Sequence, residues 1–96
     1  MTILDDIVAD KRNIVARAKR DTPVSDLEGM PLFSRPTLDL RGSLTAAPVF
    51  ALIAEIKRKS PSVGAMAEIV DPVDLARTYA ANGAAAISVL TDFHYF

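Results

Sequence analysis

The chain of 96 residues has no cysteine and no tryptophan, and it has a single histidine. Without cysteine there is no disulfide framework, no thiolate nucleophile and no cysteine-based metal site. One histidine among scattered carboxylates argues against a zinc centre, so no metal is expected. The formal net charge of -1 lacks the basic excess typical of nucleic-acid-binding domains, so no nucleic-acid partner is expected.

Long hydrophobic runs are also missing. No apolar segment approaches the roughly 20 residues that a membrane-spanning helix needs. The start of the chain, Met1–Asp6, is acidic where a signal peptide would be basic and then apolar. A content of 50% hydrophobic and 24% charged residues is ordinary for a globular protein. We therefore expect a cytoplasmic protein with no membrane partner.

Residues 3–20 have the spacing of an amphipathic helix. Ile3, Ile7, Ile14 and Ala18 fall on one stripe, and Thr2 is placed to cap the first turn. Acidic residues come early and basic residues late, which suits the helix dipole. Such a helix can lie on a membrane, but the absence of aromatic anchors favours packing against a protein surface.

Residues 21–48 hold four of the six prolines and two of the four glycines. This composition predicts an irregular connection, with a short helical turn near Ser25–Gly29. We therefore divide the chain into an N-terminal helical extension with its connecting segment, residues 1–48, and a second part, residues 49–96.

The second part has the pattern of one βαβ unit and so predicts an α/β fold. Residues 50–57 and 84–90 are mostly apolar and short, as in strands that are buried on both faces. Between them, a polar loop over residues 58–70 leads to a helix that begins at Asp71-Pro72 and ends at Asn82-Gly83. The two strands are expected to be parallel.

The first of these strands ends on an unusual charged pair. Side chains alternate along a strand, so Ile53, Glu55 and Lys57 share one face. Taking an ion pair out of water costs several kcal/mol per ion, roughly, unless its partners compensate. In parallel α/β folds, ligands bind at the C-terminal ends of the strands. Glu55 and Lys57 are therefore a candidate catalytic pair; a structural salt bridge at the rim of the strand is the alternative.

The neighbouring polar residues are ambiguous when taken alone. The tripeptide Ser60-Pro61-Ser62 is typical of a turn. Arg58 and Lys59 have the character of solvated loop charges, and a phosphate contact by one of them is the alternative. His94 has no recognisable partner in the pattern and is not assigned a role.

Two blocks together resemble a known family. Residues 53–62 read IAEIKRKSPS, similar to the first-strand signature IAEIKR-x-SPS of indole-3-glycerol phosphate synthases. The second block starts at Asp71-Pro72, continues through residues 83–92 and ends at Tyr95-Phe96. It resembles the family's first helix and second strand, in the same order and with the same spacing.

The resemblance implies the N-terminal part of a (βα)8 TIM barrel, preceded by an extra helix. It implies ring closure, with decarboxylation and dehydration, of 1-(2-carboxyphenylamino)-1-deoxyribulose 5-phosphate. That small phosphorylated molecule is the expected partner, and no cofactor is expected. Lys57 would be the first-strand catalytic lysine, and Glu55 would orient it. Ser60 and Pro61 would line the mouth of the barrel, and Phe96 the pocket for the aromatic ring.

A (βα)8 barrel takes about 250 residues, whereas this pattern stops after its second strand. The family's other catalytic groups come from later strands, so we expect a truncated barrel that is inactive by itself. Its open edges should favour self-association or complementation by another chain. Three alternatives remain: another phosphosugar-binding TIM barrel, a non-catalytic fragment that acts only by association, and an inert remnant.

Overall fold

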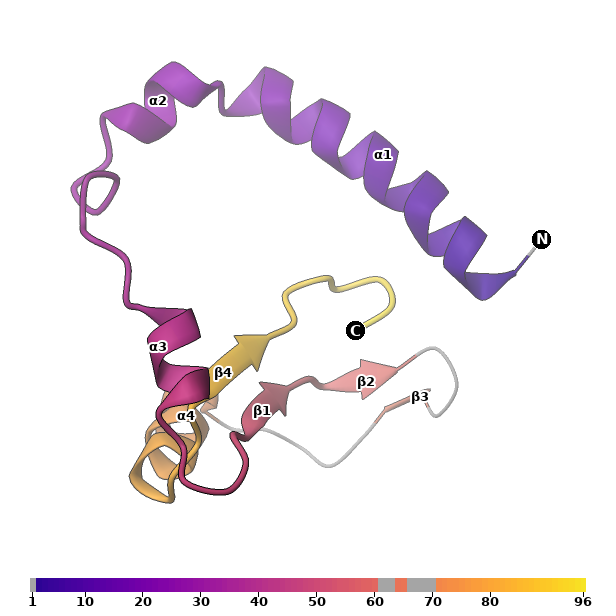
Figure 1. The fold of residues 1–96 in the computed structure, drawn as a ribbon. Helices are drawn as coiled ribbons and strands as arrows, with labels where there is room; N and C mark the ends of the chain where they lie inside the picture. The colour runs from indigo at the N-terminus through magenta and orange to yellow at the C-terminus, as the bar shows by residue number, and fades with distance from the viewer. Residues whose placement is uncertain (1, 61–63, 66–70) are drawn as a thin grey trace. The chain divides into compact units, whose positions relative to one another are not determined.

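The structure is a computed structural model that describes residues 2–60, 64–65 and 71–96 (Figure 1). It divides into two compact units, residues 1–37 and residues 38–96, called here the N-terminal and C-terminal units. The structural division falls before the helix at residues 40–45, which therefore groups with the strands. The predicted domain boundary at residue 48 stays a prediction.

The N-terminal unit consists of two helices, α1 (Ile3–Asp21) and α2 (Val24–Glu28). Thr2 caps α1 as predicted: its hydroxyl accepts a hydrogen bond from Asp5 N–H at 3.2 Å, and Thr2 N–H donates to the Asp5 carboxylate at 2.8 Å. This reciprocal capping box satisfies N–H groups that have no partner inside the helix. The helix over residues 3–20 and the short turn near residues 25–29 are both confirmed.

The C-terminal unit contains α3 (Leu40–Thr45), β1 (Ile53–Ile56), β2 (Lys59–Ser60), β3 (Gly64–Ala65), α4 (Pro72–Ala81) and β4 (Ala86–Val89). Two of these features differ from the sequence prediction. Residues 40–45 were expected to be irregular, yet Asp39 caps a short helix there by accepting from Gly42 N–H at 2.9 Å. The loop after residue 57 contains an antiparallel pairing of β2 with β3.

Strands β1 and β4 form a parallel two-stranded sheet, which confirms the predicted pairing. The strands are shorter than expected, because the ladder starts where Leu52 carbonyl accepts from Ala85 N–H at 2.9 Å. It closes where Leu90 N–H donates to the Ile56 carbonyl at 3.0 Å. Hydrophobicity predicted longer strands, but a strand extends only as far as it has a partner to pair with.

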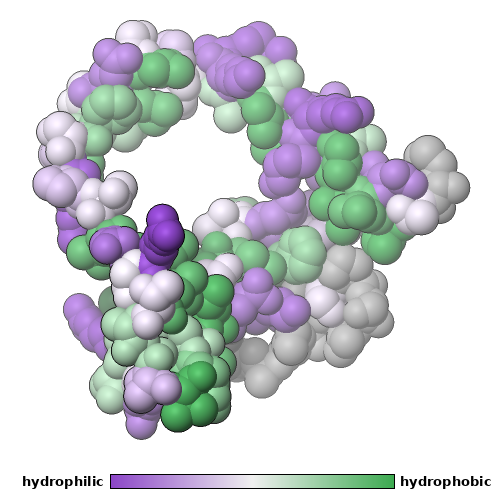
Figure 2. All heavy atoms as spheres, viewed as in Figure 1, coloured by the Kyte–Doolittle hydropathy of each residue, from purple (hydrophilic) through white to green (hydrophobic). Residues whose placement is uncertain are grey.

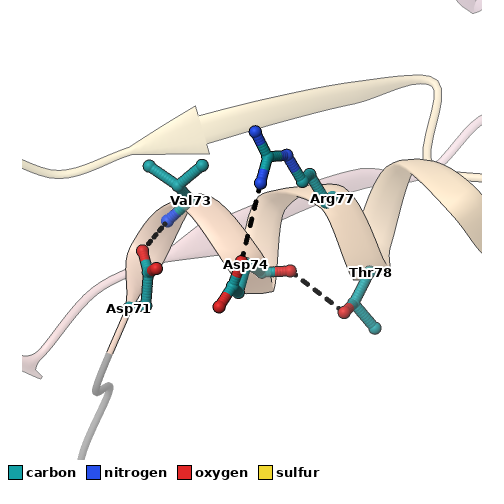
Figure 3. A network of polar contacts seen from close by, with 5 residues as sticks. All are labelled: Asp71, Val73, Asp74, Arg77 and Thr78. Carbon is teal, nitrogen blue, oxygen red and sulfur yellow. Dashed lines mark hydrogen bonds and ion pairs between the residues drawn. The ribbon is translucent and has the colours of Figure 1, made fainter.

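Helix α4 packs against both strands and completes the βαβ unit. It begins as predicted: the Asp71 carboxylate accepts from Val73 N–H at 2.9 Å (Figure 3), and Pro72 occupies the first turn. Gly83 lies in the turn between α4 and β4, and its φ of 98° is in the left-handed region that glycine tolerates. The predicted C-cap at Asn82-Gly83 is confirmed.

Little of the apolar surface is enclosed. Ile56, 4% exposed, is the one buried hydrophobic side chain among the described residues. Many other hydrophobic side chains lie open at the surface, visible as green spheres on both units (Figure 2). Helix α3 is tied to the start of β4, because Ser43 Oγ donates to the Ala85 carbonyl at 2.6 Å. No helix in the described part of the chain is long and apolar enough to cross a bilayer.

Candidate functional site

The candidate catalytic pair lies where the sequence predicted it, at the C-terminal end of β1. Glu55 is on the strand opposite Ser88 of β4, and Lys57 is the first residue after the strand. Lys57 Nζ lies 3.6 Å from Glu55 Oε2. Because side chains alternate along β1, this pair projects from the face opposite the buried Ile56. The ion pair follows directly from strand geometry.

The pair is only partly withdrawn from water. The Lys57 side chain is 32% exposed and that of Glu55 is 44% exposed. An ion pair with this exposure contributes about 0.2–1 kcal/mol to stability. The geometry therefore keeps the ammonium both oriented by a carboxylate and accessible to a ligand.

A cleft of about 190 Å³ lies at the C-terminal ends of both strands. It is lined by residues 56–58 after β1, by Pro72 at the start of α4, and by residues 89–91 and 93 around the end of β4. Lys57 and Arg58 bring two positive charges to this cleft. Its position matches the strand ends where parallel α/β folds bind ligands. We refer to it as the strand-end cleft.

A wider hollow of about 450 Å³ runs along α1, lined by six side chains between Val8 and Lys19. All of them are aliphatic or cationic side chains of a single helix. The strand-end cleft is the better candidate for chemistry despite its smaller volume, because it contains Lys57, which is paired with Glu55, at the C-terminal ends of the parallel strands.

Arg58 and Phe93 make a contact at this cleft that the sequence did not predict. The Arg58 guanidinium carbon lies 5.9 Å from the centroid of the Phe93 ring, within the range of a cation–π contact. The sequence leaves Arg58 as a solvated loop charge or a phosphate contact, and it gives Phe93 no role. No local pattern predicts their contact, since the two residues come from segments that follow different strands.

The turn after β4 is organised by Asp92. Its Oδ1 atom accepts from His94 N–H at 2.9 Å and from Tyr95 N–H at 3.1 Å. Its carbonyl accepts from Phe96 N–H at 3.0 Å. The His94 and Tyr95 rings lie 4.4 Å apart, centroid to centroid. One aspartate thus fixes the turn that carries Phe93 and Phe96.

Two of the three predicted substrate-binding residues, Ser60 and Phe96, lie in the described part of the chain. Ser60 is half-buried on β2, where it pairs in register with Gly64. Phe96 is half-buried after the Asp92 turn. Neither lines the strand-end cleft. Pro61 lies outside the described residues.

Among the described residues there is no cluster of three or more histidine, cysteine, aspartate or glutamate side chains that could hold a metal ion. Separately, the Lys57 and Arg58 side chains give the strand-end cleft a positive charge, which suits binding of an anionic group.

Comparison with known proteins assigns the family. The family model for indole-3-glycerol phosphate synthase matches residues 4–96. The chain belongs to the indole-3-glycerol phosphate synthase family. The TIM barrel is the fold of this family, and a parallel βαβ unit is consistent with part of such a barrel. This match confirms the family that the sequence motifs indicated.

Curated indole-3-glycerol phosphate synthases are similar over the whole chain. The enzyme of Roseiflexus castenholzii is 47% identical over 95 residues, covering 99% of this chain and 35% of the relative. That of Rhodopirellula baltica is 44% identical over 96 residues, covering 100% of this chain and 37% of the relative. That of Burkholderia multivorans is 48% identical over 97 residues, covering 98% of this chain and 37% of the relative. The chain thus spans little more than a third of the length of these relatives.

Proposed function

We propose that this chain supplies the first-strand catalytic lysine of an indole-3-glycerol phosphate synthase in tryptophan biosynthesis. The reaction would be the ring closure, with loss of CO2 and water, of 1-(2-carboxyphenylamino)-1-deoxyribulose 5-phosphate. The observation that supports it is the Lys57–Glu55 pair, with Nζ and Oε2 3.6 Å apart, at the C-terminal end of a parallel strand in a member of this family. The activity belongs to the lyases that release CO2.

In this proposal Lys57 acts on the substrate and Glu55 acts on Lys57. An ammonium group has three N–H donors, and at 3.6 Å Glu55 pairs with it by charge and not through a short hydrogen bond. The N–H donors of Lys57 would bind a substrate oxygen, where they would transfer a proton or stabilise developing negative charge. Glu55 would hold the ammonium in place through the ion pair and offset part of the positive charge.

Ser60, Pro61 and Phe96 are proposed to contact the substrate around this lysine. The support is their position by motif in the segments that follow β1 and β4, together with the half-burial of Ser60 and Phe96. The phosphorylated substrate suits the positive charge that Lys57 brings to the strand-end cleft. The absence of a cofactor, the absence of a nucleic-acid partner and the cytoplasmic location stay predictions.

We also propose that the 96-residue chain acts only together with a complementing segment. Catalytic groups that act as a unit lose most of their effect when one is missing, so one lysine and its partner should give negligible turnover alone. Ile53 and Val89 are 54% and 51% exposed, and β1 pairs only with β4 among the described residues. Such open apolar strands recruit other chains, which favours complementation or self-association.

Turnover measured by indole fluorescence tests both statements. The 96-residue chain is assayed with and without the complementary remainder of a family relative, such as the Roseiflexus castenholzii enzyme. Activity only in the mixture is the expected result. Activity of the chain alone would contradict the need for a complementing segment. Absence of activity in a mixture whose components associate, shown by sedimentation, would contradict the synthase function and favour a fragment that only associates.

A further inference from the structure

Arg58 directly follows Lys57 and reaches across to the segment after β4. Its guanidinium carbon lies 5.9 Å from the centroid of the Phe93 ring. Both residues line the strand-end cleft together with Lys57. The contact therefore joins, at the same cleft, two segments that come from different strands.

Two backbone features place these partners. Leu90 N–H donates to the Ile56 carbonyl at 3.0 Å, which aligns the two strand ends in register. Asp92 then accepts from His94 N–H and Tyr95 N–H through one carboxylate oxygen, fixing the turn that begins at Phe93. The Phe93 ring thus lines the cleft from a turn with a fixed backbone, and the Arg58 side chain reaches it from the segment after β1.

Phe93 is 79% exposed, so its ring contributes little to the enclosed core. An exposed ring with a guanidinium over its face is favourable because the ring face is electron-rich and the arginine stem covers apolar surface. Lys57 sits between the end of the ladder and Arg58, so its backbone is anchored on one side by the strand and on the other by this contact.

We propose that Arg58 is a positioning residue: by binding the Phe93 ring it anchors the segment after β1 and thereby holds Lys57 in the strand-end cleft. This inference rests on the proposed function for its effect on turnover, but not for the contact itself. Arg58 need not touch the substrate, because it acts through the position of Lys57.

The contact is tested first without any activity measurement, by NMR on the 96-residue chain. The Arg58 side-chain N–H resonance should be shifted by the Phe93 ring current, and Phe93→Leu should return it to the position of a free arginine. Phe50→Leu is the matched control, since Phe50 is 78% exposed and should leave Arg58 unchanged. An Arg58 resonance at the free position in the unmutated chain would overturn the proposal.

The positioning effect is then measured on Lys57. Carbon relaxation at its Cε should report greater mobility in Phe93→Leu and in Arg58→Gln than in the unmutated chain. Arg77→Gln is the control, because Arg77 lies on α4 and pairs with Asp74 at 3.7 Å. Unchanged Lys57 mobility in both cleft variants would overturn the positioning role.

In the complemented enzyme, Phe93→Leu and Arg58→Gln should each lower kcat about two- to tenfold with little change in KM, as expected for loss of a weak contact. The kcat of the double variant should be no lower than that of the slower single variant. Phe93→Tyr keeps an aromatic ring and should therefore have the kcat of the unmutated enzyme. Additive losses, or losses that appear only in KM, would overturn the proposal. Absence of turnover in the unmutated mixture would instead count against the proposed function, and the NMR result would still decide the contact.

Discussion

Replacing Lys57 with alanine separates a catalytic lysine from a structural salt bridge. At 3.6 Å and an effective dielectric constant of about 20, the Coulomb attraction to Glu55 is about 5 kcal/mol. Desolvation and solvent screening reduce this greatly, because the two side chains are 32% and 44% exposed. The net loss of stability should therefore be below about 1 kcal/mol.

The catalytic loss should be much larger. A positioned proton donor or charge-stabilising group contributes about 100- to 10,000-fold to a rate. Lys57→Ala in the complemented enzyme should thus lower kcat at least about 100-fold, equivalent to about 2.7 kcal/mol of transition-state stabilisation. The melting temperature should fall by no more than about 4 °C.

Indole fluorescence gives the rate, and circular dichroism gives the melting temperature of the same samples. Lys59→Ala is the control, because it removes the same charge two residues further along the chain. Rate losses of similar size in the two variants would show that Lys57 has no special role and would refute the strand register used here. A large drop in melting temperature with a modest rate loss would identify the pair as structural.

Three further predictions concern stability and can be measured by circular dichroism on the 96-residue chain. Ile56→Ala should lower the free energy of unfolding by about 2–5 kcal/mol, because Ile56 is only 4% exposed and its loss leaves a cavity; a loss below about 1 kcal/mol would mean that this position is not a core. Gly83→Ala should destabilise by about 1 kcal/mol or more, since φ there is 98°, whereas Gly29→Ala, at φ -80°, should be nearly neutral. The hydrogen bonds from the backbone and side chain of Thr2 lower the pKa of Asp5 below its ordinary 3.8. Asp5 therefore stabilises α1 fully above that value, and helicity should fall as the pH drops below about 4; equal acid sensitivity in Asp5→Ala would contradict this assignment.

Local signals predicted most of the secondary structure. Capping residues marked the start of α1 and of α4, and the hydrophobic runs marked the two parallel strands. The same signals missed α3, because a six-residue helix after Asp39 has too short a hydrophobic repeat to stand out from its proline-rich surroundings. They also overestimated the length of the two parallel strands, since the hydrophobic residues continue beyond those that have a pairing partner.

The candidate site could likewise be predicted only in part. Glu55 and Lys57 could be predicted because they lie two residues apart on one strand, and the period of a strand alone puts them on one face. Arg58 and Phe93 could not be predicted as partners, because each belongs to a loop and their distance depends on the register between β1 and β4. A similar long-range dependence holds for Ser43 and Ala85, which meet only because α3 packs at the start of β4.

By itself, the sequence determined the family, the helix caps, the parallel βαβ pattern and the Glu55–Lys57 pair, because each depends on residues close together in the chain or on a motif of fixed spacing. Tertiary structure alone decided where the strands end, that Ile56 is enclosed while Ile53 is open, and that Arg58 lies over Phe93. Those features depend on contacts between segments far apart in the sequence, and a local pattern of side chains does not specify which distant segment will make the contact.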